Sequence, residues 1–163
     1  MESPDKWSFD YLSEEQERFK FKALAESGAL LLGRNTYEQF AKAWPSITCE
    51  SGYADMMNNY PKYVVTSTLK EAKWNNTTLI KDNIFDEITK LKQQPGKDIL
   101  IFGSAELVYT LTHQNLIDEY KLMIFPTIVG NGKRIFEEGS SRKSLQHVKT
   151  DTFDSGVVVL TYT

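Results

Sequence analysis

Short apolar runs alternate with longer amphipathic stretches along the first two thirds of the chain. The runs that have the length and composition of buried strands are residues 29–32, 62–67, 78–81, 98–103 and 119–126. Two more strand-like runs, 145–153 and 157–163, flank a turn at Asp154-Ser155-Gly156. This order predicts an α/β fold in which a mostly parallel central sheet is flanked by helices and followed by an antiparallel C-terminal hairpin.

The amphipathic stretches predict the helices between these strands. Ser13 with Gln16 has the spacing of a capping box before a first helix, and Gly28 is expected to end that helix. Further helices are predicted over 36–43, 53–58 and 84–92, and another is predicted to open at Ser104. Trp44-Pro45 and Pro61 stand where a helix has to stop.

Composition and charge narrow the possible functions. The 163 residues predict one domain over 1–163 with a sizeable core, and the net charge of -3 offers no basic surface for nucleic acid. No apolar run approaches the roughly 20 residues that cross a bilayer, and the polar, acidic N-terminus does not resemble a signal peptide. With Cys49 as the one cysteine and two histidines without ligand spacing, we expect no disulfide, no metal site and a cytoplasmic location.

Glycine and polar residues stand at the carboxyl ends of three predicted strands, where open α/β sheets bind ligands. The three segments are Gly33-Arg34-Asn35-Thr36, Thr66-Ser67-Thr68 with Lys70, and Gly103-Ser104-Ala105. At two of them a helix starts at once, and its free N–H groups favour an anion. Glycine lets the backbone approach a phosphate, and an arginine can hold one through two hydrogen bonds. Together the segments predict a site for a molecule with several phosphates.

Each segment also has a plain structural explanation. Glycine is common where a strand ends, and arginine is commonly exposed on a protein surface. Thr66-Ser67-Thr68 is also typical of an ordinary loop, and Ser104 of a helix N-cap. The argument for a ligand therefore depends on the coincidence of all three segments after apolar strands.

Four segments occur in an order that resembles the dihydrofolate reductase superfamily. They are "LLLGRNTYE", "YVVTSTLK", "ILIFGSAELVYTL" and "DEYKLMIFPTIVGNGKRIF". The more similar branch contains the reductase domain of riboflavin biosynthesis and many uncharacterised bacterial reductases. The resemblance covers nearly the whole chain. It implies a dihydrofolate reductase-like fold, NADPH as cofactor, and a homodimer with the late strands and the "FPTIVGNGK" loop near the interface.

The resemblance also implies roles for the residues at the three strand ends. Gly33, Arg34 and Thr36 would meet the adenosine 2′-phosphate and the pyrophosphate. Thr66 and Ser67 would contact the adenosine phosphate side, with Lys70 as added charge. Phe102, Gly103, Ser104 and Ala105 would cradle the pyrophosphate and the nicotinamide ribose. Relatives often have a second glycine in place of Ser104, whose hydroxyl can itself donate to a phosphate. Arg34 and Ser67 near the ribose would favour NADPH over NADH.

Candidates for the chemistry itself are fewer. Counted back without gaps from Gly33, Glu17 falls near the pterin-binding acid of dihydrofolate reductases, where an apolar pocket would help it assist protonation. A solvated glutamate is the alternative, because Glu17 lies in the charged stretch "SEEQERFKFK". Candidates for the wall of a flat-ring pocket are Trp7, Phe9, Phe19 and Trp44, for which core packing is the alternative.

Members of this superfamily normally begin with an apolar strand before the first helix, whereas "MESPDKWSFDY" resembles the segment after it. In this fold that strand lies beside 98–103 and 119–126. The chain is therefore expected to lack the family's first strand, and an empty slot would leave two strand edges unpaired. Three explanations are open: a truncated start, a slot filled by another segment such as one of a partner chain, or a rearranged sheet.

The expected function is an NADPH-dependent reductase. It would transfer a hydride to the C=N or C=O carbon of a small flat heterocyclic substrate, pterin- or pyrimidine-like, or of a carbonyl compound. Since the cofactor carries the hydride, the protein needs little acid–base machinery. Two alternatives remain: a module that binds NADPH or another nucleotide without chemistry, and a flavin-binding protein, because FMN would suit the same phosphate-binding features.

Overall fold

The computed structural model describes residues 7–132, 134–136 and 142–163. Its α-helices are α1 (Glu14–Glu26), α2 (Arg34–Ala43), α3 (Tyr53–Asn59), α4 (Ile84–Gln93) and α5 (Ala105–His113). Its strands are β1 (Ser27–Gly33), β2 (Lys62–Val65), β3 (Thr77–Ile80), β4 (Asp98–Ile101), β5 (Tyr120–Ile124), β6 (His147–Thr152) and β7 (Val158–Tyr162). Two 3-10 helices are η2 (Phe9–Tyr11) and η3 (Trp44–Ser46). The predicted α/β alternation and the C-terminal hairpin are therefore confirmed.

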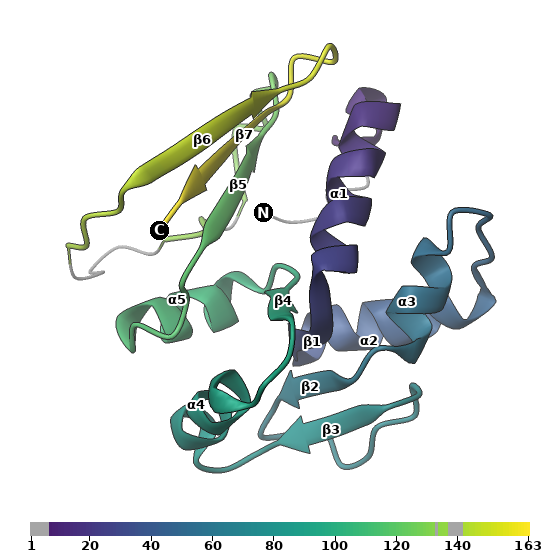
Figure 1. Cartoon of the computed structure of the whole chain (residues 1–163), viewed down its shortest axis with the longest axis vertical. Coiled ribbons are helices and arrows are strands. Elements are labelled where there is room, and N and C mark those ends of the chain that lie inside the picture. Colours follow the sequence, from purple (N-terminus) through teal and green to yellow (C-terminus); the bar gives the residue numbers. More distant parts are fainter. Residues whose placement is uncertain (1–6, 133, 137–141) are drawn as a thin grey trace.

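The strands form two sheets (Figure 1). One is parallel, in the order β3-β2-β1-β4, and the other is antiparallel, in the order β5-β7-β6. The fold prediction is confirmed with one refinement, because the C-terminal hairpin pairs with β5 in a sheet separate from the parallel one. Within the described residues, β4 pairs with β1 alone and β5 with β7 alone, so the two expected unpaired edges are present.

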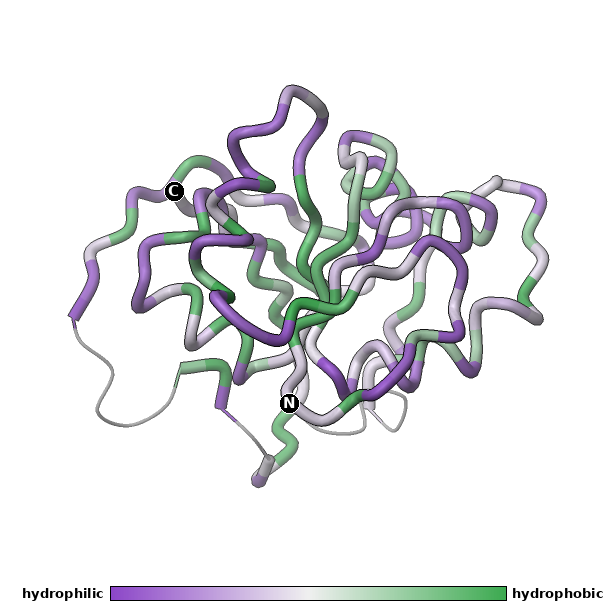
Figure 2. The backbone as a smooth tube through the Cα atoms, turned by 90° about the horizontal axis from the view of Figure 1, so that it is seen from below, coloured by the Kyte–Doolittle hydropathy of each residue, from purple (hydrophilic) through white to green (hydrophobic). Residues whose placement is uncertain are grey.

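The central strand β1 explains why the parallel sheet needs helices on both faces. Successive side chains of a strand point to opposite faces, so Leu30 and Leu32 share one face and Leu31 takes the other. Leu30 and Leu32 pack in the core cluster that contains Leu24 of α1, whereas Leu31 packs with Leu111 of α5. Hydrophobic residues accordingly gather in the middle of the molecule, with many hydrophilic ones at its periphery (Figure 2).

Helix α1 connects the two sheets. Its last turn buries Leu24 against the parallel sheet, while Phe19 packs on Phe153 beside the hairpin, with ring centroids 5.9 Å apart. Gly28 follows the end of this helix, as expected, but it lies in β1 and does not take the left-handed backbone of a typical helix-ending glycine. The helix ends at Glu26, and β1 starts at once at Ser27, whose hydroxyl donates to the Leu24 carbonyl at 2.7 Å. No helix within the described ranges is long and apolar enough to cross a membrane.

A buried lysine joins the ends of several elements at the amino end of β2. Lys62 opens β2 and is fully buried, and its Nζ donates to the carbonyl oxygens of Asn58, Tyr60 and Asn75 at 2.8, 2.9 and 3.1 Å. The same ammonium lies 4.3 Å from the ring centroid of Trp74. Lys62 therefore anchors the end of α3 and the segment before β3. Burial lowers its pKa from 10.5 to about 8.

Replacement of this lysine tests its role. Lys62→Met should lower the free energy of unfolding by about 2–3 kcal/mol, because three carbonyls lose a charged donor. Between pH 8 and 10.5 the unfolded chain binds the lysine proton and the folded one does not, so wild-type stability should rise with pH relative to the variant. Urea unfolding of both proteins at pH values on either side of 8 measures this. A stability difference that shrinks as the pH rises would contradict the assignment.

Candidate functional site

Sheet register brings the three predicted segments to one edge of the parallel sheet. Leu31 pairs with Ile101, so Gly33 and Gly103 each follow two residues beyond that pair. Gly33 also pairs with Val65, which places Thr66 next to the start of α2. Three strand ends that lie apart in sequence therefore become neighbours at one edge.

Gly33 and Ser104 are in direct contact at this edge. A Cβ atom on Gly33 would lie 2.8 Å from the Cβ of Ser104 and closer still to its Oγ, so the position has no room for a side chain. Ser104 is the N-cap of α5, and its Oγ accepts a hydrogen bond from the N–H of Leu107 at 3.4 Å. Gly33 is the N-cap of α2 and has no side chain to cap it. The amino ends of α2 and α5 therefore start from touching residues.

The turn before α5 leaves backbone accessible. Gly103 and Ser104 both have left-handed backbone, with φ of 56° and 58°. Apart from Gly103 and its two chain neighbours, no described residue has an atom within 4 Å of the place where a Cβ of Gly103 would stand, so a ligand can approach the backbone there. The first N–H groups of a helix have no partner inside it. At α5, the N–H groups of Ala105 and Glu106 thus have no acceptor inside the helix.

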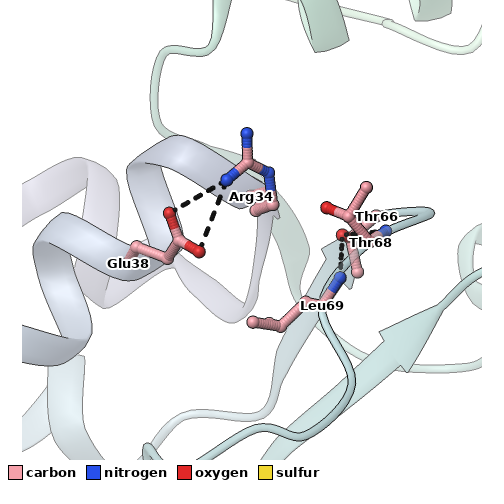
Figure 3. A network of polar contacts seen from close by, with 5 residues as sticks. All are labelled: Arg34, Glu38, Thr66, Thr68 and Leu69. Atoms are coloured by element: carbon pink, nitrogen blue, oxygen red, sulfur yellow. Dashed lines mark hydrogen bonds and ion pairs between the residues drawn. The ribbon is translucent and has the colours of Figure 1, made fainter.

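Arg34, the first residue of α2, forms an ion pair with Glu38. Its Nη1 donates to the two carboxylate oxygens of Glu38, at 3.2 and 3.5 Å (Figure 3). The two side chains are 44% and 46% exposed. The remaining nitrogens of the guanidinium point away from Glu38 (Figure 3). Arg34 can therefore still bind an anion, but with a carboxylate beside it.

Thr66 shapes the loop that follows β2. Its buried hydroxyl accepts hydrogen bonds from the N–H groups of Thr68 and Leu69, at 3.2 and 3.0 Å (Figure 3). This turn leaves the side chains of Ser67 and Lys70 exposed. Thr66 therefore orients the loop, whereas Ser67 and Lys70 are available to a ligand.

Helix α2 also holds the later part of this loop. The Tyr37 hydroxyl accepts hydrogen bonds from the N–H groups of Lys73 and Trp74, at 3.0 and 3.1 Å. Tyr37 is itself buried and packs in the core with Trp74. The loop that contains Ser67 and Lys70 is thereby fixed against the helix that begins with Arg34.

An aromatic group extends from the edge into the protein. Phe102, which follows β4, packs on Phe40 of α2 with ring centroids 5.8 Å apart, and Phe40 packs on Trp44 at 6.2 Å. Trp44 is thus linked to the strand end through Phe40. This arrangement gives the edge an apolar wall next to Gly103.

The other three aromatic candidates lie elsewhere. Trp7 packs on Phe125 after β5, with centroids 5.2 Å apart, and Phe19 packs on Phe153 beside the hairpin. Phe9 is 61% exposed. The structure therefore does not bring the four aromatic candidates together in one pocket.

Glu17 lies on the exposed face of α1. The polar side chain that α1 buries is the neighbouring Gln16, which is 1% exposed and whose Nε2 lies 3.1 Å from Met123 Sδ of β5. The Oε1 of Gln16 is buried without a hydrogen-bond partner. Glu17 therefore lies in solvent, as in the alternative interpretation of the sequence, and not in an apolar pocket.

Sequence reasoning missed two residues of this edge, Glu38 and Phe40. Glu38 had a readable signal, because residues four apart on a helix lie side by side. Phe40 had a weaker signal, since only the packing of β4 against α2 shows which aromatic ring meets Phe102.

Two partly open pockets lie away from this edge. Two adjoining cavities of about 230 and 210 Å³ lie at the carboxyl end of α5, opposite its Ser104 end. Both are lined by Thr112, Tyr120, Lys143 and Leu145. Neither pocket is lined by a residue of the three strand ends.

The contact between the two helix starts can be tested at Gly33. Gly33→Ala should lower the free energy of unfolding by about 1–3 kcal/mol, because the new methyl group overlaps the Ser104 side chain. Gly96→Ala is the matched control, since no atom lies within 4 Å of its Cβ position. Thermal and urea unfolding of the three proteins measure the effect. Equal losses in the two variants would show that the close contact is absent.

Comparison with known proteins places this geometry in a family. Residues 2–159 match the model of the RibD C-terminal domain. Two uncharacterised proteins of Bacillus subtilis (strain 168) are similar. YyaP is 35% identical over 142 residues, which are 85% of this chain and 75% of YyaP. YwjB is 29% identical over 128 residues, which are 78% of this chain and 69% of YwjB.

Solved structures share the fold. A presumed riboflavin biosynthesis protein from Shewanella sp. PV-4 superposes with a TM-score of 0.75 at 24% identity, over 96% of this chain and 85% of that one. The diaminohydroxyphosphoribosylaminopyrimidine deaminase/5-amino-6-(5-phosphoribosylamino)uracil reductase of Thermotoga maritima gives 0.66 at 12% identity, over 93% of this chain and 49% of that one. The family match covers almost the whole sequence and confirms the resemblance drawn from its motifs: the chain belongs to the RibD C-terminal domain family.

Proposed function

We propose that this chain is an NADPH-dependent reductase of a small flat heterocyclic, pyrimidine- or pterin-like, or carbonyl substrate. The family supports a reductase, since the Thermotoga protein that shares the fold is named as a deaminase and 5-amino-6-(5-phosphoribosylamino)uracil reductase. The observation that carries the proposal is the contact of Gly33 with Ser104, which puts the anion-binding ends of α2 and α5 side by side.

The residues at the edge fit a dinucleotide with several phosphates. Helix N-termini favour phosphate groups, and the open space at Gly103 lets a pyrophosphate reach the backbone. Ala105 and Glu106 would donate their N–H groups to it, and the Ser104 hydroxyl can donate while its lone pairs cap α5. Arg34 and Ser67 would meet a phosphate on the adenosine ribose.

When bound, NADPH supplies the hydride, and the protein's share is to orient the rings. Phe102 and Phe40 meet edge to face, with 66° between their ring planes, and would give a ring of the ligand an apolar contact next to Gly103. Reduction of a C=N or C=O bond also adds a proton to the nitrogen or oxygen. The exposed position of Glu17 favours solvent as the source of that proton.

A second candidate is a module that binds a nucleotide or a flavin without chemistry. The edges of β4 and β5 that are unpaired within the described residues favour it. The superfamily resemblance implies a strand between them that forms part of the nicotinamide and substrate wall. Turnover with carbonyl or pterin substrates would separate a reductase from such a module. A yellow purified protein would indicate a flavin.

We also propose a homodimer whose interface includes the segment after β5. Three apolar side chains there are exposed: Ile124, Val129 and Ile128, the last of which is 97% exposed. Such exposed apolar side chains would be covered in a contact with a second copy of the chain.

Binding of the cofactor is the first test. The purified protein should bind NADPH with micromolar affinity, and Arg34→Ala should weaken this about tenfold, because a charged hydrogen-bond donor to phosphate is lost. Nicotinamide and tryptophan fluorescence report the titration. Arg18→Ala, at an exposed cation of α1, should bind as the wild type does. A folded protein that binds no NADPH would refute the proposed function.

Light scattering coupled to size-exclusion chromatography tests the homodimer. The wild type should have twice the mass of the chain, and Ile128→Lys should shift it to the monomer, because a charge replaces an exposed apolar contact. Ile47→Lys, at an apolar side chain 40% exposed after η3, is the matched control and should remain dimeric. A monomeric wild type at the highest concentration tested would exclude this interface.

A further inference from the structure

The positive charge that the edge offers to a phosphate is partly neutralised within α2. Arg34 and Glu38 lie four residues apart, so the helix itself puts the two side chains together, with Nη1 3.2 Å from the nearer carboxylate oxygen. The first turn of α2 contains no acidic residue, so Glu38 brings negative charge to a helix start that otherwise lacks it. A phosphate on the free side of the guanidinium would then lie near a carboxylate of like charge.

Exposure of the pair makes this carboxylate relevant to a ligand. Both side chains are almost half exposed, so neither is committed to the core and both stay within reach of an approaching phosphate. Like charges a few ångströms apart near a surface repel, and dissolved salt weakens this repulsion. A ligand without the extra phosphate would not experience the effect.

From this geometry we infer that Glu38 sets the dinucleotide preference of the site. Its carboxylate opposes the 2′-phosphate at Arg34, so that the chain accepts NADH as well as NADPH. This inference rests on the proposed function. It modifies the expectation from the sequence, where Arg34 and Ser67 alone favoured NADPH.

The test compares the affinities of two ligands for variants of one residue. Dissociation constants for NADPH and NADH are measured by nicotinamide fluorescence for the wild type, Glu38→Gln and Glu38→Asp, each shown to be folded by circular dichroism. Glu38→Gln should bind NADPH about fivefold more tightly at low salt and NADH within about twofold of the wild type. The gain for NADPH should shrink as salt is added, because screening weakens the repulsion.

Two further variants separate charge at the site from charge on the protein as a whole. Glu38→Asp keeps the charge and should keep the wild-type ratio of the two affinities. Glu26→Gln removes the carboxylate of a similar pair on α1, where Glu26 lies 3.8 Å from Lys22, and should change neither affinity. A gain in Glu38→Gln that Glu26→Gln reproduces would contradict the inference.

The outcomes distinguish this inference from the function it rests on. If both dinucleotides bind but Glu38→Gln leaves their affinity ratio unchanged, or weakens NADPH, Glu38 does not oppose the phosphate. The proposed function then stands and the inference fails. If neither dinucleotide binds the folded wild type or Glu38→Gln, the proposed function fails and the inference with it.

Discussion

The absence of a side chain at Gly33 is the constraint on which the candidate site depends. Ser104 occupies the space where a Cβ would stand, so β1 can end directly beside the cap of α5. Because β1 and β4 are parallel neighbours, both helices then start at the same edge of the sheet. One close contact between the end of β1 and the N-cap of α5 thus brings the starts of the two helices together.

The other residues of the edge fall into two groups, one packed in the protein and one exposed to solvent. Tyr37 and Thr66 fix the loop after β2 through hydrogen bonds to backbone N–H groups, and Phe102 and Phe40 form an apolar wall. These contacts are buried or partly buried and give the edge its shape. The pair of Arg34 and Glu38 is more exposed and carries charge. In this account the packed residues decide whether a dinucleotide binds, and the exposed pair decides which one is preferred.

Much of the fold could be predicted from the sequence, because the signals were local. The three leucines of β1 indicated a strand buried on both faces, and each is buried. The turn at Asp154-Ser155-Gly156 indicated the hairpin, which pairs as expected. The separation of the two sheets could be anticipated only through the family resemblance. Gly28 follows the C-cap of α1, as the sequence predicted, but a cap hydrogen bond to the Leu24 carbonyl comes from the hydroxyl of Ser27.

The three strand ends of the candidate site could also be located from the sequence, since parallel strands share one carboxyl edge. Their mutual contacts could not, because the meeting of Gly33 with Ser104 depends on the register between β1 and β4. Whether Glu17 or Gln16 faces the interior depends on how α1 is rotated against β5, which a charged stretch does not reveal. Glu38 was readable from helix spacing alone, but its importance follows from the position of Arg34 at the edge.

Backbone amide NMR during an NADPH titration tests the central claim most directly, because it reports on each helix start separately. If α2 and α5 form one site, the amide signals of Asn35, Thr36, Ala105 and Glu106 should shift together and saturate at the same ligand concentration. Shifts confined to one helix start, or separate saturation of the two, would show that the contact of Gly33 with Ser104 does not create a common site.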